Sequence, residues 1–109
     1  MTTFDDREKA FENKYAHDAD LQWRATARRN RLLGEWAAGE MGMTDTDEIA
    51  SYAKAVVKAD LEEPGDEDVV RKVMADLEAR GTGIGEEVLR QKLVELMKTA
   101  KDQLMKETD

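Results

Sequence analysis

The stretch that decides the fold runs from Gly39 to Gly65 and reads Gly-Glu-Met-Gly-Met-Thr-Asp-Thr-Asp-Glu-Ile-Ala-Ser-Tyr-Ala-Lys-Ala-Val-Val-Lys-Ala-Asp-Leu-Glu-Glu-Pro-Gly. Asp45, followed three residues later by Glu48, is a capping box, a sequence feature that starts helices. Apolar residues then recur at the spacing of one helix face: Ile49, Tyr52, Ala53, Val56, Val57 and Leu61. Pro64 and Gly65 end the pattern. The stretch therefore predicts a helix with a core-facing stripe, bounded by two turns.

On its N-terminal side, a longer helix is predicted over Ala16–Trp36, since Gly34 is the first Gly or Pro in it. Its broad apolar face is made of Leu21, Ala25, Leu32 and Trp36, with Trp23, Ala27 and Leu33 beside it. Both tryptophans are expected to be mainly structural, as core residues or interface anchors. The turn at residues 39–42 is short, so this helix and the next should be antiparallel neighbours.

On the C-terminal side, a third helix is predicted from about Asp66 to Arg80, with an acidic first turn. Its inward residues are Val69, Val70, Val73 and Leu77, with Met74 flanking them. A last helix runs almost to the C-terminus and presents Ile84, Val88, Leu89, Leu93, Leu96, Met97, Ala100 and Leu104. No stretch has the pattern of a strand. We expect an all-α four-helix bundle in one domain, residues 19–109, whose helices are either regular and up-and-down or splayed.

Residues 1–18 form a helical pattern that is too thinly apolar for a good core element. Phe4, Phe11 and Tyr15 lie on one stripe, and charged residues occupy most of the rest. Two interpretations are about equally supported: the rings pack on the protein's own core, or they dock on a partner. In the second case the segment is mobile when free and becomes helical on binding.

Composition narrows the classes of function. The chain has 109 residues and a net charge of −8, which opposes broad nucleic-acid binding. Residues 1–31 hold seven Lys and Arg against six Asp and Glu, whereas residues 32–109 hold ten against nineteen. There is no cysteine, and His17 is the only histidine, so neither a thiolate site, a helical zinc pair nor a Ser-His-Asp arrangement has support. We expect no metal and no enzyme, and no segment is apolar enough to be a signal or a membrane span.

Two motifs remain open to more than one interpretation. Arg24, Arg28, Arg29 and Arg31 favour a clamp on carboxylates of the later helices or of a partner protein, with a nucleic-acid contact as the weaker alternative. The second motif opens the last helix and consists of Gly81, Thr82, Gly83 and Gly85 around Ile84. Its backbone N–H groups could hold a phosphate of ATP or ADP, although it lacks the Lys of a P-loop. A helix cap with a turn is the other interpretation.

The N-terminal string Met-Thr-Thr-Phe-Asp-Asp-Arg-Glu-Lys-Ala-Phe-Glu-Asn-Lys-Tyr-Ala-His-Asp, residues 1–18, resembles the zeta subunit of alphaproteobacterial F-type ATP synthases. So do Ala-Arg-Arg-Asn-Arg-Leu-Leu-Gly at 27–34 and Trp-Ala-Ala at 36–38. The resemblance implies an all-helical bundle with a mobile N-terminal segment that inhibits ATP hydrolysis. It implies that residues 1–18 enter a catalytic α/β interface beside the rotor shaft.

On this resemblance, the ring anchors are Phe4, Phe11 and Tyr15, and charge assigns Arg7, Lys9 and Lys14 to acidic groups of the catalytic head. The expected partners are the alpha, beta and gamma subunits, with no nucleic acid and no membrane insertion. The protein would be a cytoplasmic monomer when free and would lie at the inner membrane through the synthase. It would need no cofactor, with ATP or ADP as a regulatory ligand. The alternative is a small nucleotide-binding sensor that acts on another protein partner.

Overall fold

The computed structural model describes residues 19–61 and 65–108 of the chain. Within these ranges it contains four helices and no strand, which confirms the all-α, four-helix expectation. The helices are α2 (Ala19–Glu40), α3 (Thr46–Ala59), α4 (Glu67–Ala79) and α5 (Glu86–Thr108). No helix in this part of the chain is long and apolar enough to cross a membrane.

Helices α2 and α3 make a close pair, and the local sequence explains why. Asp45 caps α3, because its carboxylate accepts a hydrogen bond of 3.0 Å from the backbone N–H of Glu48. Gly34 of α2 lies directly against the backbone of Ala53 in α3, so a Cβ at position 34 would be only 2.6 Å from the Cα of Ala53. A glycine at the crossing therefore sets how closely the two helices approach.

The main core lies where α2, α3, α4 and the first half of α5 meet. It consists of Leu33, Ala37, Met41, Val56, Val69, Val70, Val73, Leu77, Leu89 and Leu93. Trp36, Tyr52 and Met74 pack against it while half-buried, as the stripes of the sequence predict. The third predicted helix has the expected position, with Asp66 preceding its first residue.

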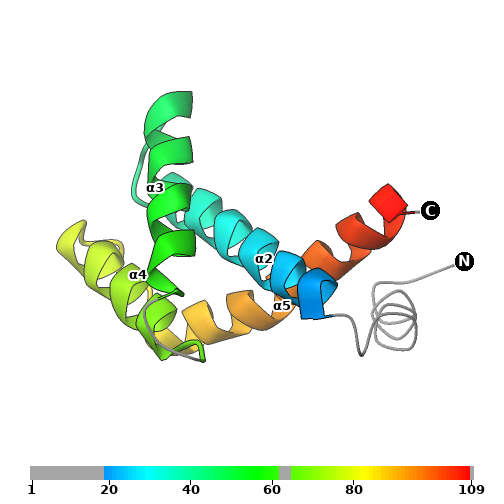
Figure 1. Ribbon diagram of the computed structural model, residues 1–109. Coiled ribbons are helices and arrows are strands. Elements are labelled where there is room, and N and C mark those ends of the chain that lie inside the picture. The colour runs from blue at the N-terminus through cyan, green and yellow to red at the C-terminus, as the bar shows by residue number, and fades with distance from the viewer. Residues whose placement is uncertain (1–18, 62–64, 109) are drawn as a thin grey trace, which may run out of the picture.

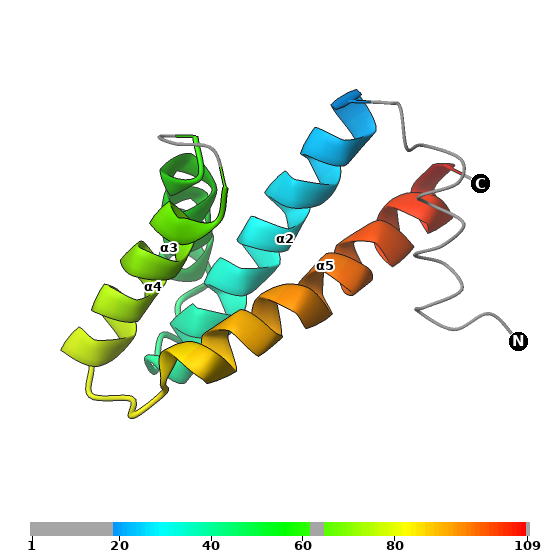
Figure 2. The ribbon, with the colours of Figure 1, turned by 90° about the horizontal axis from the view of Figure 1, so that it is seen from below.

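The second half of α5 packs on the first half of α2. Ala25, Leu104 and Met105 form a separate buried cluster there, flanked by Leu21 and Met97. Figure 2 shows α2 and α5 side by side and antiparallel. Helix α5 therefore contributes to both apolar clusters formed by the described residues.

The bundle is splayed, one of the two arrangements that the sequence leaves open. In Figure 1, α3 stands away from the long axis of α2, and α4 and α5 form a wide V. Helix α2 ends at Glu40, inside the stretch from Gly39 to Gly42 that was expected to stop it. Three residues differ from the sequence predictions. Leu61 and Val88, both assigned to buried stripes, are exposed, and Met105, absent from the predicted stripe, is buried.

Candidate functional site

The residues predicted to carry inhibition are not part of the described structure. Phe4, Arg7, Lys9, Phe11, Lys14 and Tyr15 all lie outside residues 19–61 and 65–108. Their roles stay predictions. The structure does describe the helix that follows them, and its neighbours.

The arginine cluster on α2 is divided between structural and surface roles. Arg28 donates two hydrogen bonds, of 2.6 and 3.0 Å, to the carboxylate of Glu107 near the end of α5. A third, of 3.3 Å, reaches the side-chain oxygen of Gln103. The hydrogen bond from Arg28 lowers the pKa of the Glu107 carboxyl, and the charges of Arg28, Arg24 and Arg31 act in the same direction. This pair ties α2 to α5.

Arg29 is buried and points the other way. Its Nη2 lies 2.8 Å from the Oδ1 of Asp66, at the start of α4, and its Nε and Nη2 also donate to the Oδ1 of Asn30. Thus Arg28 and Arg29 clamp carboxylates of later helices, as the charge pattern predicts. Arg29 lies four residues after Ala25 and four before Leu33, so its burial fits the apolar face of α2 in spite of its charge. Asn30 lies outside that face, and its burial is not visible in the sequence.

Arg24 and Arg31 remain exposed and make no ion pair with a residue in the described part of the chain. They border a groove between α2 and α3, which we call the α2–α3 groove. It has a volume of about 600 Å³ and is lined by Arg31, Glu35, Asp47, Ala50, Ser51, Ala53, Lys54, Val57, Lys58 and Leu61. It continues past Val57 into a hollow of about 270 Å³ that Trp23, Arg24, Ala27 and Leu104 help to line.

Trp23 stands at the edge of this hollow with 58% of its surface exposed, and Leu61 has 65% exposed. Trp23 is therefore not part of the core, one of the two roles expected for it, and its role as an interface anchor stays a prediction. Trp23 lines the hollow that Val57 of α3 and Leu104 of α5 also line, whereas Trp36 packs against the core. An apolar groove bordered by an exposed tryptophan is a surface that could receive another apolar element.

A polar cluster joins α3 to α4. The hydroxyl of Tyr52 donates to the Oδ2 of Asp76 at 2.8 Å, and the Nζ of Lys72 lies 3.1 Å from the same oxygen. The Lys72 Nζ is also 5.3 Å from the centre of the Tyr52 ring. Burial, followed by the hydrogen bond and charge of Asp76, raises the pKa of Tyr52 above its ordinary value. A phenol held protonated in this way is a structural donor, because it is a poor base and nucleophile.

The glycine-rich turn before α5 caps α4. Gly81 and Gly83 have φ angles of 66° and 74°, and the backbone N–H of Thr82 donates to the carbonyl of Leu77 at 3.2 Å. The Thr82 hydroxyl also donates to that carbonyl, at 3.1 Å, and accepts from the N–H of Ile84 at 3.3 Å. The hydroxyl of Thr82 and the backbone N–H groups of Thr82 and Ile84 thus make hydrogen bonds within the turn.

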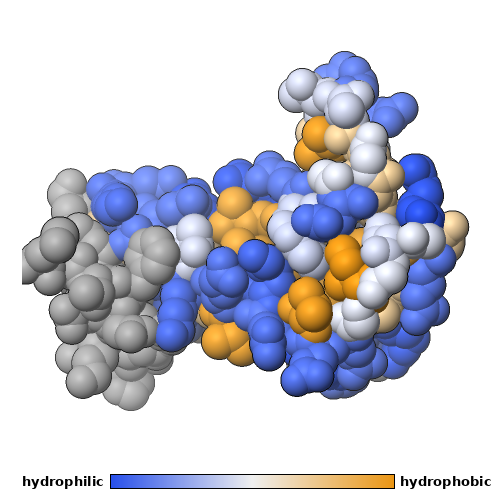
Figure 3. All heavy atoms as spheres, turned by 180° about the vertical axis from the view of Figure 1, so that it is seen from behind, coloured by the Kyte–Doolittle hydropathy of each residue, from blue (hydrophilic) through white to orange (hydrophobic). Residues whose placement is uncertain are grey.

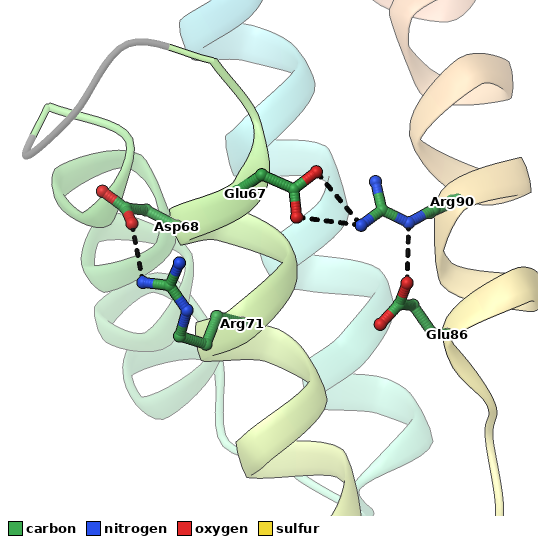
Figure 4. A network of polar contacts seen from close by, with 5 residues as sticks. All are labelled: Glu67, Asp68, Arg71, Glu86 and Arg90. Atoms are coloured by element: carbon green, nitrogen blue, oxygen red, sulfur yellow. Dashed lines mark hydrogen bonds and ion pairs between the residues drawn. The ribbon is translucent and has the colours of Figure 1, made fainter.

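Carboxylates surround the start of α5 (Figure 4). Arg90 donates from Nε to Glu86 at 2.9 Å and from Nη2 to both oxygens of Glu67, at 3.0 and 3.1 Å. These hydrogen bonds raise the pKa of Arg90, with Glu67 the larger cause. The neighbouring Arg71 is held by Asp68 at 2.9 Å. Arg90 and Arg71 therefore already neutralise carboxylates, whereas Arg80, directly before Gly81, donates to the carbonyl of Met41 at 3.4 Å.

Across residues 19–61 and 65–108, no group of three Asp, Glu, His or Cys side chains is placed to hold a metal ion. Nor does the geometry above bring together a nucleophile and a base. The two arginine clamps and the capped turn hold the helices together, whereas the α2–α3 groove is open to another molecule.

The fold and this surface define a small all-α protein with an apolar groove between two of its helices. Comparison with known proteins identifies the family. The sequence profile of ATPase inhibitor subunit zeta matches residues 1–103, and the chain belongs to this family.

One solved structure, determined by solution NMR, has a sequence 48% identical to this chain. The two superpose with a TM-score of 0.71, over 80% of this chain and 98% of the other. No curated protein matches the chain.

Proposed function

We propose that this protein is a regulatory subunit that blocks ATP hydrolysis by the catalytic head of an F-type ATP synthase. The observation that supports the proposal most directly is the match to ATPase inhibitor subunit zeta over residues 1–103, which includes the whole N-terminal segment. A protein of this family acts on another enzyme and need not be an enzyme itself.

In the proposed mechanism, residues 1–18 enter a catalytic α/β interface next to the rotor shaft and block rotation in the hydrolytic direction. Phe4, Phe11 and Tyr15 would bury their rings in the interface, and each buried ring contributes roughly 2–3 kcal/mol before the cost of ordering the segment. Arg7, Lys9 and Lys14 would pair with acidic groups of the head. The partners are thus the alpha, beta and gamma subunits, and the protein reaches the membrane surface through them.

The test is ATP hydrolysis by alphaproteobacterial heads that have been stripped of their own zeta subunit. Full-length protein should inhibit, and the Phe4→Ser/Phe11→Ser/Tyr15→Ser variant should not. Val88→Ser/Val94→Ser is the matched control, because it removes apolar surface from exposed positions on α5, where these residues are 48% and 62% exposed. Full inhibition by the triple variant would reject the proposed anchors, and no inhibition by the wild type would reject the function.

Regulation by ATP or ADP at Gly81, Thr82, Gly83 and Gly85 stays a prediction. Amide NMR shifts recorded during titration of either nucleotide into the protein would test it. Saturable shifts confined to this turn would support a nucleotide site. A flat titration would leave the turn as the cap of α4 that its hydrogen bonds describe.

A further inference from the structure

The α2–α3 groove offers a second binding surface, separate from the N-terminal segment. We propose that it holds an acidic amphipathic helix presented by the ATPase head, so that the bundle itself grips the enzyme that residues 1–18 inhibit. This inference rests on the proposed function for the identity of the partner. The groove itself is defined by residues within the described structure.

The shape of the groove favours a helix as its occupant. On α3, its lining runs from Asp47 to Leu61, which at about 1.5 Å per residue is roughly 21 Å, or four helical turns. A groove between two helices accepts the apolar ridge of a third, with anchors at i, i+3, i+4 and i+7. Figure 3 shows α3 standing out from the body of the molecule, with apolar surface on it.

The apolar residues of this surface are gathered in one place. Val57 lines the groove and also the hollow that contains Trp23, while Leu61 is exposed at the end of α3. A single exposed leucine is ordinary in a folded protein. Trp23 and Leu61 are different, because both also line a small hollow with Val57 between α2 and α3. Aromatic side chains beside an apolar pocket are the usual anchors of protein interfaces.

The charged residues along the edge of the α2–α3 groove indicate the chemistry of its partner. Arg24, Arg31, Lys54 and Lys58 line the groove and its continuation, and none of these four makes an ion pair with a residue that the structure describes. Among the described residues they face Glu35, Asp47 and Asp60. Arg24 and Arg31 also interact with Glu107, whose ion pair is with Arg28 of the same hollow. The border is thus slightly basic in a chain whose net charge is −8. An approaching helix with carboxylates along its flanks would satisfy these four cations.

The same charge argues against a second copy of this chain as the occupant. Two copies, each with a net charge of −8, repel one another before any local contact forms. A partner whose acidic residues are confined to one helix avoids most of this repulsion. The structure therefore favours a different protein, and the enzyme that the family inhibits is the one already required by the proposed function.

The first experiment measures binding of the full-length protein to stripped ATPase heads. Trp23→Ser/Leu61→Ser should weaken binding by about tenfold or more, which corresponds to about 1.4 kcal/mol per factor of ten. Arg24→Glu/Arg31→Glu should weaken it further as salt is lowered, because the reversed charges then repel the carboxylates more strongly. Val88→Ser/Val94→Ser is the matched control and should stay within about twofold of the wild type. All of these positions are exposed, so circular dichroism should show every variant folded.

A photo-crosslink identifies the occupant directly. With Leu61→benzoylphenylalanine in the full-length protein, irradiation of the complex with the head should yield a crosslink to an acidic helical segment of a head subunit. A crosslink to residues 1–18 of the same chain, or to a second copy, would overturn the inference. So would wild-type affinity in the Trp23→Ser/Leu61→Ser variant.

The two proposals fail in different ways. If the wild type inhibits the head and the groove variants bind and inhibit as well as it does, only the groove inference is wrong. If the wild type neither binds nor inhibits, the proposed function is wrong and the groove inference falls with it. If the groove variants lose binding but Phe4→Ser/Phe11→Ser/Tyr15→Ser binds without inhibiting, both proposals are supported as separate contacts.

Discussion

The Nη2 of Arg29 lies 2.8 Å from the Oδ1 of Asp66 and so joins the middle of α2 to the start of α4. The Arg29 side chain is only 6% exposed, whereas that of Asp66 is 48% exposed. Asp66 is the residue before α4, yet its carboxylate makes no capping hydrogen bond. It serves the buried guanidinium instead, which explains how an arginine can lie inside this small protein.

Asp66→Asn should destabilise the fold by about 1–3 kcal/mol, because the buried guanidinium of Arg29 would keep an amide oxygen as acceptor at position 66 but lose the negative charge of the carboxylate. The loss in free energy of unfolding is measured by urea denaturation, with circular dichroism as the signal. Glu87→Gln is the control, because Glu87 is an exposed acid in the first turn of α5 and should change stability by less than about 1 kcal/mol. Equal effects of the two substitutions would show that Asp66 acts only on the helix dipole.

The crossing of α2 and α3 gives a second prediction. Gly34→Ala should cost about 1–3 kcal/mol, because its Cβ would lie 2.6 Å from the Cα of Ala53 and 3.3 Å from the Cγ2 of Val56. Backbone atoms cannot move aside as a flexible side chain can. The two helices would have to separate, so chemical shifts along α3 should change as well.

Gly39→Ala is the matched control for this substitution. Gly39 is also in α2, but nothing lies within 4 Å of a Cβ built there. Alanine has the higher helix propensity, so this variant should be more stable by up to about 1 kcal/mol. If both variants were stabilised, the close approach at Gly34 would be refuted.

Much of the fold could be predicted from the sequence where a helix has one buried face. The stripe of α3, its capping residue Asp45 and the inward valines of α4 all follow from spacing alone. The buried face of helix α2 is harder to predict, because this helix packs against α3 on one side and α5 on another. Its buried surface therefore includes Arg29 and Asn30, while Trp23 is left in water. The splay of the bundle depends on contacts such as Gly34 with Ala53, which join residues far apart in the sequence.

The candidate binding surfaces, too, could be predicted from the sequence only in part. The arginine pattern predicts a carboxylate clamp, but only the structure assigns Arg28 to Glu107, Arg29 to Asp66, and leaves Arg24 and Arg31 at the groove. The groove has no sequence motif, since residues of α2 and α3 line it together. The exposed Leu61, at the end of the predicted α3 stripe, was its nearest sequence signal.

Tyr52 gives a prediction at alkaline pH. Burial and Asp76 raise its pKa, which means that folding favours the protonated phenol. Stability from this group is therefore complete below the ordinary value of 10.0 and is lost as the pH rises above it. In a Tyr15→Phe background, absorbance at 295 nm should show Tyr52 ionising well above pH 10.0.

Asp76→Asn should lower the Tyr52 pKa only in part, because burial is the larger cause of the shift. A return to the ordinary value in this variant would mean that Asp76, and not burial, controls the tyrosine. No change at all would remove Asp76 from the explanation.

Glu107 gives the corresponding prediction at acid pH. The hydrogen bond from Arg28 lowers its pKa below the ordinary 4.5, so folding favours the carboxylate. The stability that the pair supplies is therefore present above pH 4.5 and is lost as the pH falls through the lowered value. Carboxyl NMR titration should find Glu107 below the ordinary value in the wild type and close to it in Arg28→Met. Because the carboxylate is solvent-accessible, added salt should narrow the difference. An identical Glu107 titration in the two proteins would show that Arg28 does not hold the end of α5 through its charge.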